Sequence, residues 1–298
     1  MRMIKWMSLV ALTIGASGCG GLCNDGVFAG TIVLERDGWL IEGSSGLLHS
    51  TPDERFPYAD GSPFLECRVI GGLSVREEGV SIDGDRYPLL EELGFIGVQL
   101  DDFGGERIVD EISGFDTVTT FGGIGGAVRQ ASVRSISGFN NVERVEGSLL
   151  ATASITGFRS LREVGGTLNV ANLEGVTGLL RVGGRFELNG GFESVDLQVL
   201  EDVGGDLVIM QTRLEAIQFP TLGHVGGLVE VFGNPLDSWG GFARGARIDG
   251  DFRARGNSPI RDADFEAWLV ASETQVAGSV TICANRPINE EGTTCLDR

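Results

Sequence analysis

Lysine and histidine are almost absent from this chain. Its 298 residues include two histidines, and Lys5 is the only lysine. Schiff-base chemistry and Walker-type phosphate loops need a lysine amine, so both are excluded. Histidine catalysis needs a nucleophile and an orienting partner, and the chain has no Gly-x-Ser-x-Gly nucleophile elbow. We therefore interpret His224 as a surface residue at a corner, and we expect no catalytic residue.

Positive charge is also scarce. Lysine and arginine number 23 against 42 acidic residues, which gives a formal net charge of -19. Proteins that bind nucleic acid need a basic stripe to meet the phosphates, so the composition excludes nucleic acid as a partner. Hydrophobic residues make up 42% of the chain, which is enough to bury a sizeable core. The composition thus predicts a folded, acidic protein.

What the chain has in abundance is a short repeat. Between Val145 and Val225, a valine is followed five times by two residues of a corner, Glu-Gly in the first copy and Gly-Gly in the other four, and then by an alternating run. The valines recur about every 18 to 22 residues, a period typical of short solenoid coils. Many of the 47 glycines lie at these corners, where a tight bend needs a residue without a β-carbon. The five copies are Val145-Glu146-Gly147, Val164-Gly165-Gly166, Val182-Gly183-Gly184, Val203-Gly204-Gly205 and Val225-Gly226-Gly227.

The run after each corner has the period of a β-strand. Its second and fourth residues are apolar, as in residues 167–170, which places one side of the strand in a core. A second corner motif, of the type Ile136-Ser137-Gly138-Phe139, recurs between the first ones. Asn234, Asn257 and Asn285 share one offset from their glycines, which predicts a ladder of amide hydrogen bonds between coils. The residues predicted to point inward are Leu168, Val170, Phe186, Leu188, Leu207, Ile209, Val229 and Val231.

Both ends of the repeat are predicted to be capped. The segments Thr31 to Leu34 and Trp39 to Ile41 have the pattern of a short hairpin at the amino-terminal end. Helical periodicity is scarce until Ser258-Pro259, where a cap residue and a proline precede a helical pattern from Asp262 to Ala271. We expect one helix there, over the carboxy-terminal coils. Its predicted packing residues are Phe265, Trp268 and Leu269.

The amino terminus has the pattern of an export signal. A basic start precedes the apolar run from Trp6 to Ile14, and small residues follow. Residues 16–19, Ala-Ser-Gly-Cys, resemble the bacterial lipoprotein box, in which cleavage frees Cys19 to carry a diacylglycerol. The resemblance implies a signal peptide at 1–18 and a lipid anchor in a membrane, and Gly20 favours the outer membrane. An ordinary signal peptide with cleavage nearby is the alternative.

Four cysteines remain if Cys19 is lipidated. Exported proteins form disulfides, and four cysteines allow three pairings. A solenoid keeps its ends far apart, so we expect Cys23 to pair with Cys67 and Cys283 with Cys295, each bridge fastening one cap. Zinc is the competing interpretation, but the cysteine spacings and histidine partners of zinc sites are missing. We therefore expect neither a metal nor a cofactor.

The segment that opens the repeat resembles a known family. Residues 67–75, Cys-Arg-Val-Ile-Gly-Gly-Leu-Ser-Val, are similar to the opening of the L domains in insulin-type and epidermal-growth-factor-type receptors. The Gly-Phe and Val-Gly-Gly corners match the same family's coils, so the resemblance covers roughly residues 67–285. It implies a mainly β, right-handed, parallel β-helix-like solenoid, related to leucine-rich repeats, that recognises ligands by a sheet face without catalysis.

This resemblance also divides the mature chain. A lipid-anchored segment and cap would occupy residues 19–66, and a solenoid with a C-terminal disulfide cap would occupy residues 67–298. The chain departs from the family in two respects, because Cys23 lies further from Cys67 than in the family's first pair and no cysteine-rich module is present. Receptor signalling is therefore not implied.

The outward side of the strands suggests where a ligand binds. Four residues are apolar at positions that the alternation assigns to the outside, and charged residues lie beside them. An accessible apolar patch edged by charge is a common mark of a partner site, here for a protein or a glycan. Cover by a loop, the cap or the C-terminal helix is the alternative. The predicted binding residues are Val208, Met210, Leu228, Glu230, Phe232, Arg253 and Arg255.

Two other functions stay open. A structural spacer in the envelope needs no patch, and a polysaccharide-active enzyme needs two carboxylates at a set separation. Glu187 and Glu230 flank Val208 in successive coils and would lie about 10 Å apart, slightly beyond the usual inverting geometry. The acidic pairs that we interpret as solvated rather than as calcium ligands are Asp83 with Asp85 and Asp101 with Asp102.

Overall fold

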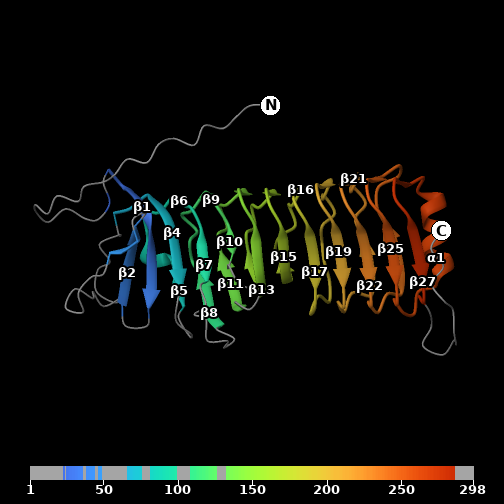
Figure 1. The fold of residues 1–298 in the computed structure, drawn as a ribbon, viewed down its shortest axis with the longest axis horizontal. Helices are drawn as coiled ribbons and strands as arrows, with labels where there is room; N and C mark the ends of the chain where they lie inside the picture. The colour runs from blue at the N-terminus through green and yellow to red at the C-terminus, as the bar shows by residue number, and fades with distance from the viewer. Residues whose placement is uncertain are drawn as a thin grey trace, which may run out of the picture.

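The protein is a solenoid of stacked coils. A computed structural model describes residues 23, 25–35, 38–43, 46–48, 66–75, 81–98, 108–125 and 132–285. Most elements in these ranges are β-strands, and a single α-helix lies at the C-terminal end. The coils follow one another along the long axis in sequence order (Figure 1). The prediction of a mainly β chain with stacked parallel sheets and one C-terminal helix is confirmed.

One side of the solenoid is a continuous parallel sheet, which we call the long stack. Each strand pairs with its counterpart in the next coil, so that Leu188 lies beside Ile209 and Ile209 beside Val231. This stack begins in the second half of β4 (Val69–Val75). It continues through β7 (Ile96–Val98), β10 (Ile124–Gly125), β13 (Leu149–Gly157), β15 (Leu168–Glu174), β17 (Phe186–Asn189), β19 (Leu207–Met210), β22 (Val229–Phe232), β25 (Phe252–Arg255) and β27 (Val280–Cys283).

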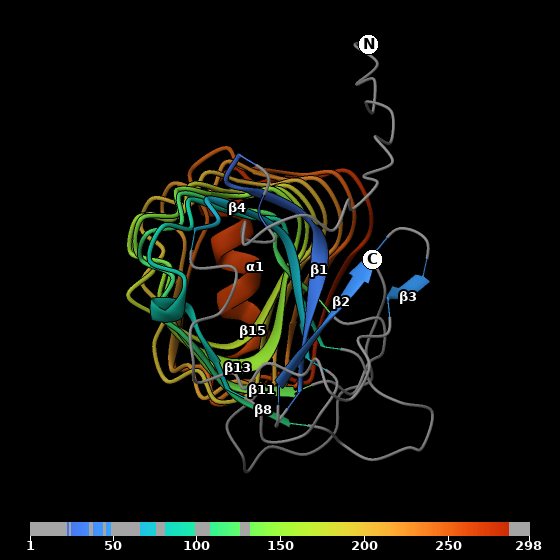
Figure 2. The same cartoon turned by 90° about the vertical axis from the view of Figure 1, so that its left-hand side faces the viewer.

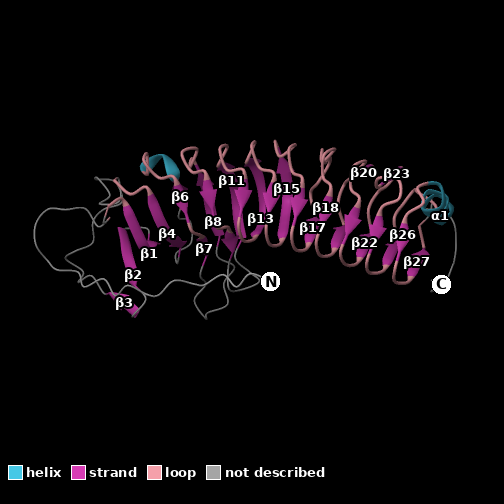
Figure 3. Ribbon diagram, turned by 90° about the horizontal axis from the view of Figure 1, so that it is seen from above, coloured by secondary structure: helices cyan, strands magenta, loops and turns pink. Residues whose placement is uncertain are grey.

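A second side consists of two-residue strands, which we call the short stack. It starts where the first residues of β4 pair with β6, and each later strand precedes a corner of the repeat (Figure 3). The second residue of each of these strands is apolar, and most of these side chains are buried. The strands are β6 (Glu92–Leu93), β9 (Thr120–Phe121), β12 (Arg144–Val145), β14 (Glu163–Val164), β16 (Arg181–Val182), β18 (Asp202–Val203), β21 (His224–Val225), β24 (Arg247–Ile248) and β26 (Gln275–Val276).

The third side is less regular. In the first coils β5 (Ile82–Asp83), β8 (Ile108–Ser113) and β11 (Ser132–Gly138) pair in parallel and continue into the ends of β13 and β15. The short 3-10 helix η2 (Gly84–Arg86) follows β5. In later coils this side keeps a two-stranded sheet, β20 (Ala216–Gln218) with β23 (Ser238–Gly241).

The core fills the inside of the coils. All eight side chains predicted to point inward are 1% exposed or less. At the second corner motif Phe115, Phe139 and Phe158 adopt positive φ angles of 62°, 55° and 54° and turn their rings inward. Their ring centroids lie 4.9 Å apart from coil to coil, so the rings form a stack inside the solenoid.

The glycine corners are set by close contact between coils. A β-carbon on Gly183 would lie 2.3 Å from the carbonyl oxygen of Gly165, and one on Gly204 would lie 2.3 Å from that of Gly183. The amide of Gly184 donates to the Gly166 carbonyl at 2.9 Å. These corner glycines do not have positive φ. Absence of a β-carbon is needed as predicted, but for backbone-to-backbone packing rather than for a strained bend.

The asparagine ladder is confirmed in the last coils. Asn257 donates from Nδ2 to the carbonyl of Val231 at 2.9 Å and to Oδ1 of Asn285 at 2.8 Å. Asn234 makes the equivalent bonds to Ile209 and to Asn257, each at 3.0 Å. All three amides are buried, and the polar column therefore runs through the interior with its hydrogen bonds satisfied.

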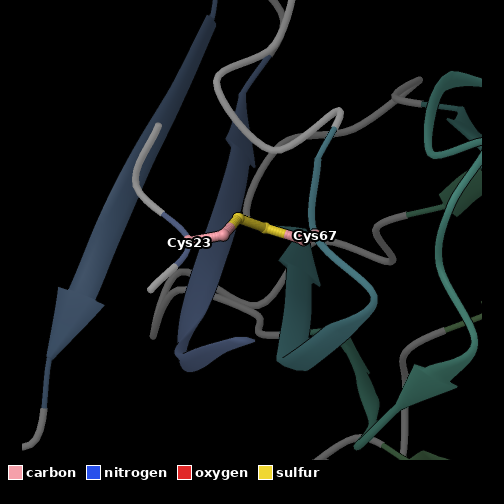
Figure 4. Close-up of a disulfide and its surroundings, with 2 residues drawn as sticks. All are labelled: Cys23 and Cys67. Carbon is pink, nitrogen blue, oxygen red and sulfur yellow. A yellow bond between two sulfur atoms is a disulfide. The ribbon is translucent and has the colours of Figure 1, made fainter. Parts of the chain in front are cut away.

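At the amino-terminal end a hairpin continues the sheet. Strand β1 (Val27–Glu35) pairs in parallel with β4 and antiparallel with β2 (Gly38–Gly43), which in turn pairs with β3 (Gly46–Leu48). The predicted hairpin is confirmed, with Leu34 opposite Trp39. Cys23 and Cys67 form the predicted disulfide beside it, with Cα atoms 5.5 Å apart (Figure 4).

The helix α1 (Asp262–Ala271) closes the other end. Viewed along the long axis it lies within the outline of the coils (Figure 2), where Phe265 is fully buried and Trp268 and Leu269 pack on the core. Its bounds match the prediction, but its N-cap is Arg261 rather than Ser258, and the Arg261 amide donates to Asp264 at 3.1 Å. Cys283 is disulfide-bonded, but its predicted partner, Cys295, lies outside the described residues, so this pairing stays a prediction.

Candidate functional site

The predicted binding residues gather on the outer face of the long stack. Register places Met210, Phe232 and Arg255 side by side on β19, β22 and β25. Val208, Glu230 and Arg253 form the neighbouring row. Three successive coils therefore bring together side chains that are distant in sequence, since Met210 and Arg255 are more than 40 residues apart. We call the set Met210, Leu228, Glu230, Phe232, Arg253 and Arg255 the Phe232 patch.

Phe232 is the exposed centre of this patch. Phe232 is 39% exposed, and Leu150 on β13 is the other large apolar residue of the long stack that is exposed to a similar extent, at 40%. The Arg255 guanidinium lies 5.7 Å from the centroid of its ring, within cation-π range. Arg255 also forms an ion pair with Glu230, which fixes the guanidinium beside the ring. Phe232 is thus presented on an ordered polar support.

One predicted member of the patch is not accessible. Val208 is 1% exposed, and Met210 and Leu228 are half-buried, so the four apolar residues do not form one open surface. Val208 lies in register between Glu187 and Glu230, whose longer side chains flank it on both sides. The alternation along the strand places Val208 on the outer face, but its short side chain lies between two longer ones and is shielded from solvent.

Charged side chains around the patch are paired with one another. Arg185 contacts Glu187 at 2.9 Å and Arg253 contacts Asp251 at 2.7 Å. Glu187 and Glu230, the two acids considered for glycosidic chemistry, are therefore each held by an arginine. The sheet face presents a rim of ion pairs rather than an open pair of carboxylates.

Acidic residues after the glycine corners link successive coils. Asp206 accepts a hydrogen bond from the Leu228 amide at 2.9 Å, and Asp251 accepts one from the Ser279 amide at 2.8 Å. The bond from Ser279 is the main reason why the pKa of Asp251 lies below its ordinary value. These bonds join residues 22 and 28 positions apart, so the sequence shows no local sign of them.

A second polar column, which sequence reasoning missed, runs along the short stack. The first residues of its strands face outward, and register stacks them with mostly alternating charge. Arg144 contacts Glu163 at 3.2 Å, and Arg181 contacts Asp202 at 2.9 Å. We call this column the charged ladder. Its members are Arg144, Glu163, Arg181, Asp202, His224 and Arg247.

His224 occupies an unusual position in the charged ladder. Its Nδ1 lies 2.7 Å from Oδ1 of Asp202, and its Nε2 lies 3.2 Å from Oδ2 of Asp249. The hydrogen bond with Asp202, followed by that with Asp249, raises the pKa of His224 above its ordinary value. Partial burial opposes ionisation of Asp202, but its bonds with His224 and Arg181 lower its pKa. His224, which was predicted to be a surface residue at a corner, is thus held by two carboxylates.

The metal-ligating side chains of the described residues, which are those of histidine, cysteine and the acidic residues, do not gather into a metal site. Asp83 accepts from the Asp85 amide at 3.1 Å and pairs with Arg86, so it serves as a local cap, while the second acidic pair (101–102) lies outside the described residues. A cavity of about 310 Å³ is lined by Gly84, Asp85, Pro88, Phe115, Asp116 and Thr117.

The membrane-related predictions fall outside the described ranges. Cys19 and the signal peptide at 1–18 belong to a segment of which the structure says nothing. Within the described ranges, α1 falls short of the length and apolarity that a membrane-crossing helix requires. Comparison of the chain with protein-family models, with curated proteins and with solved structures found no match.

Proposed function

We propose that this chain is an exported, lipid-anchored protein of the cell envelope that binds a protein or a glycan without catalysing a reaction. The signal peptide would end at residue 18, Cys19 would carry the anchor, and residues 67–298 would form a right-handed solenoid of receptor L-domain type. The outer membrane is the proposed location. The Phe232 patch is the proposed binding surface.

The observation that carries this proposal is the presentation of Phe232. An aromatic ring at a protein surface leaves apolar area in contact with water, which is unfavourable unless a partner covers the ring. Aromatic residues, methionine and arginine are the residue types enriched where proteins bind one another. Phe232, Met210 and Arg255 combine all three in adjacent strands, and the ion pair with Glu230 holds the arginine in place.

Two further features support recognition over chemistry. Glu187 and Glu230 are both ion-paired, so neither is free to serve as a general acid or base without breaking an arginine contact. A rigid parallel sheet also preorganises the face, which reduces the entropy lost on binding. A structural spacer is the competing role, and it predicts that no single surface residue matters.

The test is a capture experiment with the purified fragment 20–298. We expect Phe232→Asp to abolish capture of a partner from envelope extract, because a carboxylate in place of the ring removes the apolar contact and repels Glu230. The matched control is Val199→Asp, since Val199 is similarly exposed at 37% but lies outside the patch. Circular dichroism must show all three proteins folded. Equal capture by the two variants would instead favour a spacer role or another face.

A further inference from the structure

His224 links the three coils that display the Phe232 patch. Asp202 lies in the coil of β18 and β19, which carries Met210. His224 begins the coil of β21 and β22, which carries Phe232. Asp249 follows β24 and precedes β25, which carries Arg255. One imidazole therefore contacts the coil on either side of its own.

These two contacts are both satisfied only when the ring is protonated. A neutral imidazole has one N–H and one lone pair, so it donates to a single carboxylate and turns its lone pair toward the other. Both ring nitrogens of His224 face carboxylate oxygens, at 2.7 Å and 3.2 Å. Only the imidazolium donates two hydrogen bonds, and its charge also offsets the two acids. Loss of the proton breaks one contact and leaves a carboxylate facing a lone pair.

The arginines near the ring do not cancel the stabilisation of the protonated imidazole by Asp202 and Asp249. Arg247 lies beside His224 in the register, but its guanidinium is bound to Asp249. Arg181 is bound to the second oxygen of Asp202. Each acid is thus shared between an arginine and the histidine, and the two contacts to carboxylates outweigh the neighbouring positive charge, which agrees with the raised pKa of His224.

We propose that His224 is a proton-dependent clasp: the protonated ring holds together the coils of Met210, Phe232 and Arg255 and so stiffens the recognition face, whereas the neutral ring loosens it. This inference deepens the proposed function, since it assigns a regulation to the same face and matters for binding only if that face binds. The clasp itself is a property of the described coils and exists whether or not a partner is found.

The sign of the pH effect follows from linkage. A histidine whose pKa is higher in the folded than in the unfolded protein contributes stability fully below its unfolded pKa of about 6.5. That contribution is lost as the pH rises through the higher folded value. The face is therefore expected to be held more firmly in mildly acidic than in mildly alkaline solution.

Amide hydrogen exchange of the full chain tests the clasp without any partner. The amides to follow are those of Gly226, which donates to Val203, and of Asp249, which donates to Val225. After correction for the intrinsic exchange rate, their protection should fall with rising pH by about tenfold for each unit by which folding raises the pKa of His224. In His224→Gln protection should be low and should not change across this range.

The control is His49→Gln, which removes the only other histidine and should leave the pH dependence unchanged. If His224→Gln does not fold, Asp249→Asn replaces it and should reduce the pH dependence by removing one of the two acids. An NMR titration of the two histidine rings gives the pKa directly. A ring pKa for His224 at or below about 6.5, or the same pH dependence in the glutamine variant, overturns the clasp.

Partner capture at two pH values separates the clasp from the proposed function. If protection depends on His224 but Phe232→Asp captures as well as the wild type, the clasp stands and the binding face is wrong. If capture depends on Phe232 but protection does not depend on His224, the binding face stands and its regulation by this histidine is wrong.

Discussion

At the second glycine of each corner, adjoining coils come so close that a single methyl group has no room. A β-carbon on Gly205 would lie 2.8 Å from the carbonyl carbon of Gly184 and 3.0 Å from the Arg185 amide nitrogen. Gly191 offers the opposite case, because no atom lies within 4 Å of the place a β-carbon would take. The two positions separate a glycine that packing demands from one that it does not.

We expect Gly205→Ala to lower the free energy of unfolding by about 2 kcal/mol, because backbone atoms on both coils must move apart to admit the methyl group. Gly191→Ala should leave stability unchanged or raise it by up to about 1 kcal/mol, since alanine restricts the unfolded chain. Chemical denaturation followed by circular dichroism measures both. Equal effects of the two substitutions would show that the corners tolerate a β-carbon.

On the scale of elements, the strands could be predicted and their lateral partners could not. Apolar alternation after each glycine pair identified the long stack and its buried residues, because a four-residue strand shows its period in the sequence. A two-residue strand is too short to show a period in the sequence. The charged ladder and the carboxylates that contact His224 were therefore not predicted. The prediction that Val208 is accessible was wrong for a related reason, since the exposure of Val208 depends on Glu187 and Glu230 in neighbouring coils.

The asparagine ladder ties the last coils to the cap, and its central member should be the most sensitive. Asn257 bonds to Val231 and Asn285 in addition to accepting from Asn234, so Asn257→Ala leaves several buried groups unpaired. We expect a loss of about 3 kcal/mol in the free energy of unfolding. Asn189→Ala, at an exposed position of β17, should change it by less than about 0.5 kcal/mol. Urea denaturation measures both variants. If Asn257→Ala and Asn189→Ala lower the free energy of unfolding by similar amounts, the ladder has no special structural role.

The molecule as a whole is a stack in which every coil depends on its neighbours, with a different closure at each end. Hairpin strands and the Cys23–Cys67 disulfide close the amino-terminal end, and α1 closes the other. The proposed acylation site at Cys19 lies four residues before Cys23. A lipid there would attach to the end of the stack that the disulfide fastens. The net charge, which changes from -19 to -21 when Arg2 and Lys5 are removed with the signal peptide, would keep the coils away from anionic headgroups.

Anchoring can be tested independently of binding. We expect Cys19→Ser to release the protein from membranes into the soluble fraction, because only a thiol at this position accepts the diacylglycerol and several acyl chains are needed for firm attachment. Cys23→Ser removes a neighbouring cysteine and the disulfide but spares the acylation site, so it should stay in the membrane fraction. Fractionation and intact-mass measurement distinguish the two. A wild-type protein in the soluble fraction, with a mass that lacks the acyl chains, would show that an ordinary signal peptide precedes the stack. A Cys19→Ser protein that remains bound to membranes would contradict anchoring through Cys19.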